Sequence, residues 1–184
     1  GNNYYLAGQG VSTYDLMDTI TDDMVKVNLV AIAAVLIVLI LTMRQIKTPI
    51  VLVLAIETAI WINLSIPYLQ NTPLFYIAYL IISSVQLGAT VDYAILFSDR
   101  YRECRREMDK KESIIATISQ TSVSILTSGI TMIAVGFLLG IISTHGLLSQ
   151  LGYLLGKGTI CSVLTVFFVL PGLLYLTDRK KTSF

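Results

Sequence analysis

Long apolar runs separated by short polar breaks dominate this sequence. A helix of about 20 apolar residues is long enough to cross the hydrocarbon core of a bilayer. The pattern predicts such helices at residues 25–43, 50–68, 74–99, 114–142 and 146–176. We therefore expect an all-α membrane protein, a bundle of about five transmembrane helices.

The polar breaks predict where these helices begin and end. Thr21, Asp22 or Asp23 is a suitable N-cap for the first helix. Pro49 suits the first turn of the second helix, where its missing N–H is not needed. Residues 69–73 form an uncharged turn, and Arg100 to Ser113 are expected to form a charged loop.

The two ends of the chain differ from its apolar middle. Residues 1–24 are polar and acidic, with a strand-like start at Tyr4–Ala7, and are too short to fold alone. We interpret them as the tail of an extracytoplasmic domain and a linker. Residues 177–184 form a basic tail, and the first residue is Gly1, so we expect the chain to be part of a longer protein.

Composition and charge support a membrane location and give an orientation. The chain is 54% hydrophobic and only 14% charged. Soluble domains, in contrast, carry about 25% charged residues. A net charge of +1 argues against a nucleic-acid partner. The basic residues at 44–47, 100–111 and 179–181 all fall on one side of the predicted bundle. By the positive-inside rule that side is the cytoplasm, which places the N-terminus outside and the C-terminus inside.

Asp92 is the strongest candidate for a functional residue. It is the one charged residue between Thr72 and Phe97. Along a helix it lies about 12 Å from Arg100. An acid at this depth costs several kcal/mol unless it is paired, protonated or hydrated, so it indicates a functional site. Apolar surroundings favour a neutral carboxyl group and a nearby cation favours the charged form. An acid between these influences can take up a proton from one side and release it to the other.

The neighbours of Asp92 extend this hypothesis. Gly88 lies one turn earlier on the same side of the helix, where a small residue lets another helix or water approach. Tyr93 points about 100° away, so we expect it to serve a carboxyl group on a neighbouring, equivalent helix.

Hydroxyl side chains form a stripe along the fourth predicted helix, at Thr117, Thr121, Ser124, Ser128 and Thr131. The section from Thr121 to Ser128 lies about 10 to 21 Å from the cytoplasmic side, which brackets the depth of Asp92. Two interpretations fit. The hydroxyls line a water-filled proton path, or they bond to their own helix and join it to a neighbour.

Two other charges lie inside predicted helices. Glu57 has a depth similar to that of Asp92; it is either a second protonation site or a neutral glutamic acid on a packed face. Lys157 lies about eleven residues into the fifth helix and either extends toward the outer interface or takes part in coupling. The pairs Gly136/Gly140 and Gly152/Gly156 predict close helix packing.

Signatures of enzymes are absent from the sequence. There is no phosphate-binding loop with a Gly-Lys-Ser/Thr end, no cluster of metal ligands and no Gly-x-Ser-x-Gly elbow. We expect no catalytic residues, no cofactor and no metal, and a proton gradient as the energy source.

The segment GATVDYAILFSDRYRE, residues 88–103, resembles the signature of the MMPL family (mycobacterial membrane protein large) of the RND (resistance-nodulation-division) transporter superfamily. The resemblance rests on Gly88, Asp92, Tyr93 and the cytoplasmic end Arg100–Glu103. It extends over nearly the whole chain, including residues 127–129, 151–159 and 170–174.

The resemblance implies a pseudo-twofold transporter with six helices in each half and a large outer porter domain after the first helix of each. Residues 1–24 then resemble the end of that porter domain, and the chain resembles the last five helices of one half, with the C-terminal half favoured. Asp-Tyr pairs from the two central helices face each other and relay protons. The implied activity is proton-driven export of lipids or other hydrophobic compounds across the plasma membrane, with the other half as partner.

Two other functions compete with export. Sterol-sensing domains share this helical core, so a non-transporting lipid sensor or receptor is the main alternative. An intramembrane aspartyl protease requires two facing acids, and the spacing of Glu57 and Asp92 matches no such motif.

Overall fold

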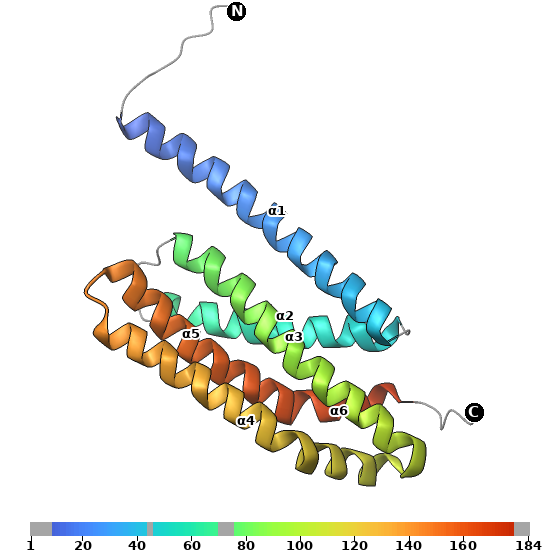
Figure 1. The fold of residues 1–184 in the computed structure, drawn as a ribbon. Coiled ribbons are helices and arrows are strands. Elements are labelled where there is room, and N and C mark those ends of the chain that lie inside the picture. The colour runs from blue at the N-terminus through green and yellow to red at the C-terminus, as the bar shows by residue number, and fades with distance from the viewer. Residues whose placement is uncertain (1–8, 44–45, 70–75, 179–184) are drawn as a thin grey trace, which may run out of the picture.

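A computed structural model describes residues 9–43, 46–69 and 76–178, and every element in these ranges is helical (Figure 1). The elements are α1 (Gln9–Met43), α2 (Lys47–Leu69), α3 (Tyr76–Glu107), α4 (Lys110–Ile142), α5 (Gly146–Leu164), the π-helical turn η1 (Thr165–Val169) and α6 (Leu170–Thr177). Five helical stretches within these ranges are long and apolar enough to cross a membrane. The predicted all-α membrane fold is confirmed.

The helices form a bundle around α5, which packs against α2, α3 and α4. Helices α4 and α5 run side by side, and α1 packs on α2 and α3 before its N-terminal part leaves the bundle (Figure 1). The junctions α1–α2 and α3–α4 lie at the same end of the bundle as α6 (Figure 1). We call this the charged end, because residues 99–112 contribute most of its charges.

The start of the first helix differs from the prediction. We expected an N-cap at Thr21, Asp22 or Asp23, but α1 continues back to Gln9. No proline or glycine interrupts residues 11–24, so the change from apolar to polar residues does not break the helix. The strand-like segment Tyr4–Ala7 lies outside the described residues, as do residues 70–75 and 179–184.

The expectation of a charged loop from Arg100 to Ser113 is also wrong. Helix α3 continues to Glu107 and α4 begins at Lys110, so the connection is only Met108 and Asp109. Arginine and glutamate favour helices, and Arg100 pairs with Glu103 one turn later. The second helix begins two residues before Pro49, which lies in its first turn as predicted.

The predicted fifth helix contains an unexpected π-helical turn. Residues 165–169 separate α5 from α6, and the Leu170 N–H donates to the Thr165 carbonyl, five residues back. Pro171 follows this turn and has no N–H to donate. A π turn at this point lets the helix continue past the proline.

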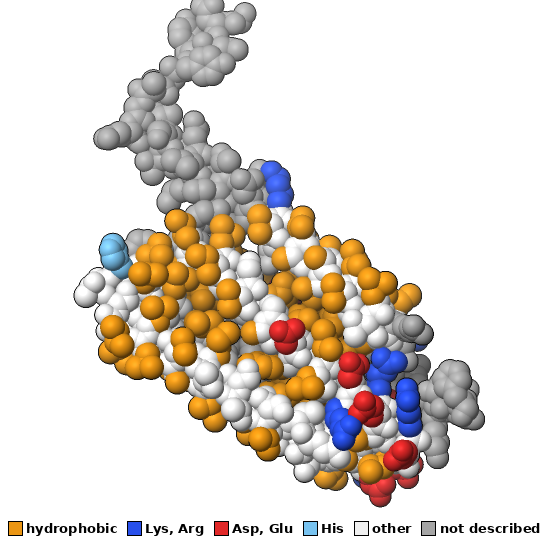
Figure 2. Space-filling view, in the orientation of Figure 1, with side chains coloured by type: hydrophobic (Ala, Val, Ile, Leu, Met, Phe, Trp, Pro, Cys, Tyr) orange, Lys and Arg blue, Asp and Glu red, His pale blue; other side chains and the backbone are white. Residues whose placement is uncertain are grey.

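One apolar core joins five of the helices and η1, with Leu39, Ile56, Phe97, Ile125, Val166 and Leu170 among its most buried members. Hydrophobic side chains are spread over much of the face seen in Figure 2, and charged ones gather at the charged end. Val123 and Phe168 are 72% and 76% exposed. Such a surface suits contact with lipid tails.

Helices α4 and α5 approach each other closely through the predicted glycines. A Cβ added at Gly136 lies 2.6 Å from the Gly156 nitrogen, and one added at Gly152 lies 2.6 Å from the Gly136 carbonyl oxygen. No larger side chain fits there without movement. The predicted role of Gly136, Gly140, Gly152 and Gly156 in packing is confirmed.

Candidate functional site

Asp92 lies in the middle of α3 with its side chain exposed on the surface of this chain, although Val91 and Tyr93 on either side are buried. The same strip of the helix exposes four other residues at helical spacing, namely Ile81, Val85, Gly88 and Leu96. We call this strip, with Asp92, the Asp92 face. Figure 2 shows an acidic side chain standing apart from the charged end among hydrophobic ones.

Gly88 opens the Asp92 face one turn from the carboxyl group. Its backbone is exposed, and a Cβ built on it has no atom within 4 Å. Unlike the glycines of α4 and α5, Gly88 therefore makes no close contact with the described residues of this chain. The space it leaves is on the outside of the bundle.

Tyr93 points into the bundle and is only 7% exposed. Its hydroxyl lies 3.2 Å from the Ser128 hydroxyl of α4, and either group can be the donor. This contact links Ser128 to the residue next to Asp92 in α3. The sequence identified both residues but did not predict that they meet. We expected the Tyr93 hydroxyl to serve a carboxyl group on an equivalent helix, but within this chain it faces α4.

The hydroxyl stripe of α4 divides into two parts. Thr117 and Thr121 are buried, and each hydroxyl donates to a carbonyl one turn earlier, at 2.6 Å and 2.8 Å. These two match the structural interpretation. Ser124 and Ser128 are exposed, so they are accessible from outside the chain near the level of Asp92.

Glu57 and Lys157, the two other charged candidates from the sequence, lie on helices other than α3. Glu57 is half-buried on α2 and lines a pocket between α1, α2 and α3. Lys157 is half-buried on α5 and has no ion pair within the described part of the chain. Across those same ranges, no group of three or more His, Cys, Asp or Glu residues could hold a metal ion.

A buried polar cluster joins α2, α3 and α5, and the sequence analysis missed it. The Asn63 amide donates to the Gln86 side-chain oxygen at 2.8 Å and to the Leu154 carbonyl at 3.2 Å. One turn along α3, the Thr90 and Ser162 hydroxyls lie 2.6 Å apart. Uncharged amide residues inside apolar runs were the available signal, because such groups need partners when buried.

A second missed cluster holds the end of α6 to α3 and α4. The Asp178 carboxylate accepts from the Arg105 guanidinium at 2.7 Å and from the Tyr101 hydroxyl at 2.9 Å. Lys110 donates to the Asp178 carbonyl and lies 5.5 Å from the centre of the Tyr175 ring. Burial acts to raise the pKa of Asp178, but these donors and cations outweigh it, so its pKa lies below the ordinary value.

Comparison with known proteins identifies the family of this chain. The model of the MMPL family matches residues 1–184, the whole chain. The chain belongs to the MMPL family. A membrane protein of Streptomyces coelicolor, SCO0839, is 29% identical over 97% of the chain. A second one from that organism, ActII-3, is 28% identical over 84% of it.

A more distant relative is named for its activity. The "probable transport protein MmpL12" of Mycobacterium tuberculosis is 26% identical over 56% of the chain, which covers 9% of MmpL12. The chain spans about a quarter of the length of the two Streptomyces proteins, 26% and 22%. The family and these names indicate multi-pass membrane proteins of a transport family rather than enzymes.

Proposed function

We propose that this chain is the transmembrane module of an exporter that uses the proton gradient to move lipids or other hydrophobic compounds. Asp92 carries the proton. The observation that supports this proposal most directly is the exposed position of Asp92 in the middle of an apolar helix. The family and the name of MmpL12 support transport as the general activity.

An exposed acid at this depth needs a polar partner. A charged aspartate at the centre of a transmembrane helix costs about 2.5–3.5 kcal/mol on insertion scales. Within this chain the Asp92 side chain is open to the outside, and Gly88 leaves room beside it. We infer that the Asp92 face is covered by the equivalent helix of the other half, or of an equivalent subunit, which supplies that partner.

Tyr93 and the serines of α4 supply the rest of the proposed relay. The Tyr93 hydroxyl can donate and accept, and it contacts the exposed Ser128 of α4. Ser124 lies one turn from Ser128 on the exposed part of the same stripe. In this proposal Tyr93 relays protons through Ser128. Ser124 and Ser128 line the path between Asp92 and water, and Thr121 supports the helix.

The proposed orientation follows from the charges. Arg100, Arg102, Arg105 and Arg106 lie at the charged end, which we assign to the cytoplasm. The proton then enters from the outside, reaches Asp92 and leaves toward the charged end of a multi-pass protein of the plasma membrane.

Transport by the full-length exporter in proteoliposomes tests this proposal. With an imposed proton gradient, the wild-type protein should move a fluorescent lipid analogue, and Asp92→Asn should reduce movement to the level of empty vesicles. Asp99→Asn is the matched control, since Asp99 lies on the same helix but near its charged end, 3.9 Å from Arg102. It should retain activity.

Two results would contradict the proposal. One is gradient-driven transport by Asp92→Asn at the wild-type rate. The other is a wild-type protein that binds the lipid analogue but never moves it, which is the behaviour of a sensor.

A further inference from the structure

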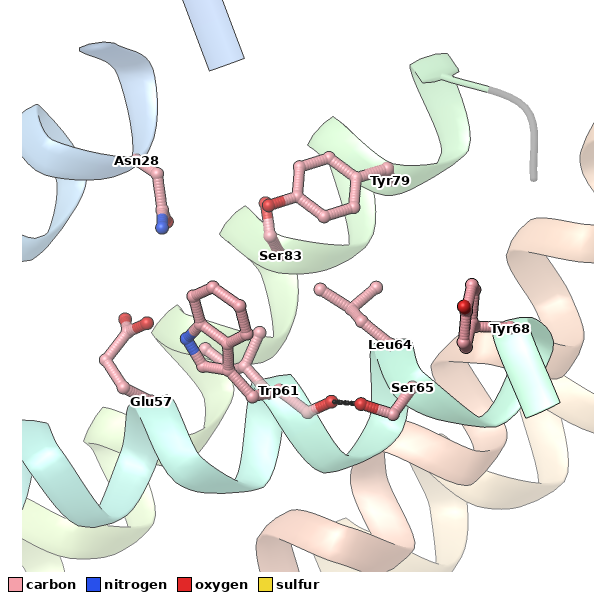
Figure 3. Close-up of a pocket in the computed structure, with 9 residues that line it drawn as sticks. Asn28, Glu57, Trp61, Leu64, Ser65, Tyr68, Tyr79 and Ser83 are labelled. Atoms are coloured by element: carbon pink, nitrogen blue, oxygen red, sulfur yellow. Dashed lines mark hydrogen bonds between the residues drawn. The ribbon is translucent and has the colours of Figure 1, made fainter. Parts of the chain in front are cut away.

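A pocket separate from the Asp92 face lies between α1, α2 and α3, and its volume is about 220 Å³. Figure 3 shows Glu57, Trp61 and Leu64 on α2, with Asn28 and Ser83 facing them from α1 and α3. Asp92 and the serines of α4 do not line it. The pocket is therefore a distinct feature of this chain.

Glu57 determines the chemistry of the pocket. Among the nine described residues that line it, Glu57 is the one that carries a charge. Its Oε1 atom is buried and has no hydrogen-bond partner among the described residues, although the Trp61 side chain donates a hydrogen bond to the carboxyl group. A buried carboxyl oxygen without a donor is unfavourable, so the pocket is suited to a ligand that brings an N–H donor and positive charge.

The residues around Glu57 also suit a cation. The Trp61 indole lies beside the carboxyl group, and Tyr79 faces it from α3 (Figure 3). Aromatic faces attract cations, tryptophan most strongly. The Ser83 hydroxyl donates to the Leu80 carbonyl at 3.1 Å. Its oxygen can therefore still accept a hydrogen bond.

The depth and volume of the pocket limit the size of the ligand that it can hold. Glu57 lies ten residues into α2. At the rise of an α-helix, this places it about 15 Å from the charged end, and Tyr68 about 16 Å farther along the helix. The pocket thus runs from the middle of the bundle to its opposite end. Its volume is below the roughly 300–1,000 Å³ of sites for drug-sized ligands, so it suits a compact molecule.

We propose that this pocket binds a compact lipophilic amine in its protonated form. The ammonium group lies against the Glu57 carboxylate and over the face of the Trp61 ring, and the apolar part extends along Leu64 toward Tyr68. Binding in this pocket does not require the proton relay. The pocket and the proposed exporter function can therefore be tested separately.

Competition binding with the full-length exporter tests the proposal. Tritiated octylamine is bound to the purified protein and displaced with unlabelled octylamine or with 1-octanol, which has the same chain and no positive charge. Octanol should compete at least tenfold more weakly. Glu57→Gln should weaken octylamine binding at least tenfold, because the amide carries no charge and has nearly the same shape.

Three further variants serve as controls. Glu103→Gln removes an exposed acid at the charged end and should bind octylamine within twofold of the wild type. Asp92→Asn should also bind within twofold even if it abolishes transport. Trp61→Leu should weaken octylamine binding about threefold or more through loss of the aromatic face. If Glu57→Gln does not fold, unchanged octylamine binding by Trp61→Leu would overturn the proposal.

Equal competition by octanol and octylamine would overturn the proposal, as would unchanged octylamine binding in Glu57→Gln. Loss of proton transport in Glu57→Gln, with no octylamine binding by the wild type, would also overturn it and would identify Glu57 as a second protonation site.

Discussion

Asp178 shows how a single carboxylate holds the charged end together. It joins the last turn of α6 to Arg105 and Tyr101 on α3, and Lys110 binds its backbone. We predict that Asp178→Asn lowers the free energy of unfolding by about 1–3 kcal/mol at neutral pH, because charged hydrogen bonds are lost. Glu107→Gln, at an exposed site near the end of α3, is the control and should change little.

The pH dependence of this contribution has a definite sign. The pKa of Asp178 is lowered in the folded protein from an ordinary value of 3.8. The stabilisation is therefore fully present well above that ordinary value and is lost as the pH falls through the lower folded-state pKa. The difference between wild type and Asp178→Asn in denaturant titrations should shrink below about pH 4. A difference that grows on acidification would contradict this assignment.

Candidate functional residues could be predicted from the sequence where their position inside an apolar helix was enough to single them out. Asp92 and Glu57 were found because a charge inside an apolar run is costly wherever the helix packs. The contact between Tyr93 and Ser128 was not predicted, because it depends on the register between α3 and α4. The same holds for Asn63 with Gln86, which come from different helices.

At the scale of helices, the spacing between α4 and α5 depends on glycine. The Cβ that Gly152→Ala adds overlaps the backbone of Gly136 and Gly140. We predict that this substitution destabilises the protein by about 1–3 kcal/mol. Gly172→Ala is the matched control, because a Cβ there has no atom within 4 Å. It should be neutral or slightly stabilising.

Thermal unfolding of the two variants in the same detergent measures this difference. Equal melting temperatures for Gly152→Ala and Gly172→Ala would show that the close approach of α4 and α5 is not required.

The helices themselves followed from hydropathy, but several of their ends did not. Apolar runs located the five stretches of the described residues that are long and apolar enough to cross a membrane, because lipid requires a helix to satisfy its own backbone hydrogen bonds. Hydropathy changes at Asp99 and near Asp22, yet neither place has a proline or glycine to stop the helix. The π turn before Pro171 was missed because a run of apolar residues carries no sign of it.

At the scale of the whole molecule, the Asp92 face is the surface that should meet the other half of the proposed exporter. Gly88 lies on this face with open space around it. We predict that Gly88→Leu leaves the fold of this bundle unchanged but abolishes transport, because the larger side chain keeps the facing helix away. Gly172→Leu places the same side chain in another open site and should retain transport.

Size-exclusion profiles and lipid transport in proteoliposomes give the two readouts for Gly88→Leu. A folded Gly88→Leu variant with wild-type transport would show that no helix approaches this part of α3.

Proton uptake by vesicles that contain the full-length protein tests the proposed role of Asp92 most directly. A pH-sensitive dye inside the vesicles reports protons that enter when substrate is added under an imposed gradient. We predict substrate-dependent uptake by the wild type and by Asp99→Asn, and none by Asp92→Asn at equal protein content. Substrate-dependent uptake by Asp92→Asn at the wild-type rate would contradict the assignment of Asp92 as the proton carrier.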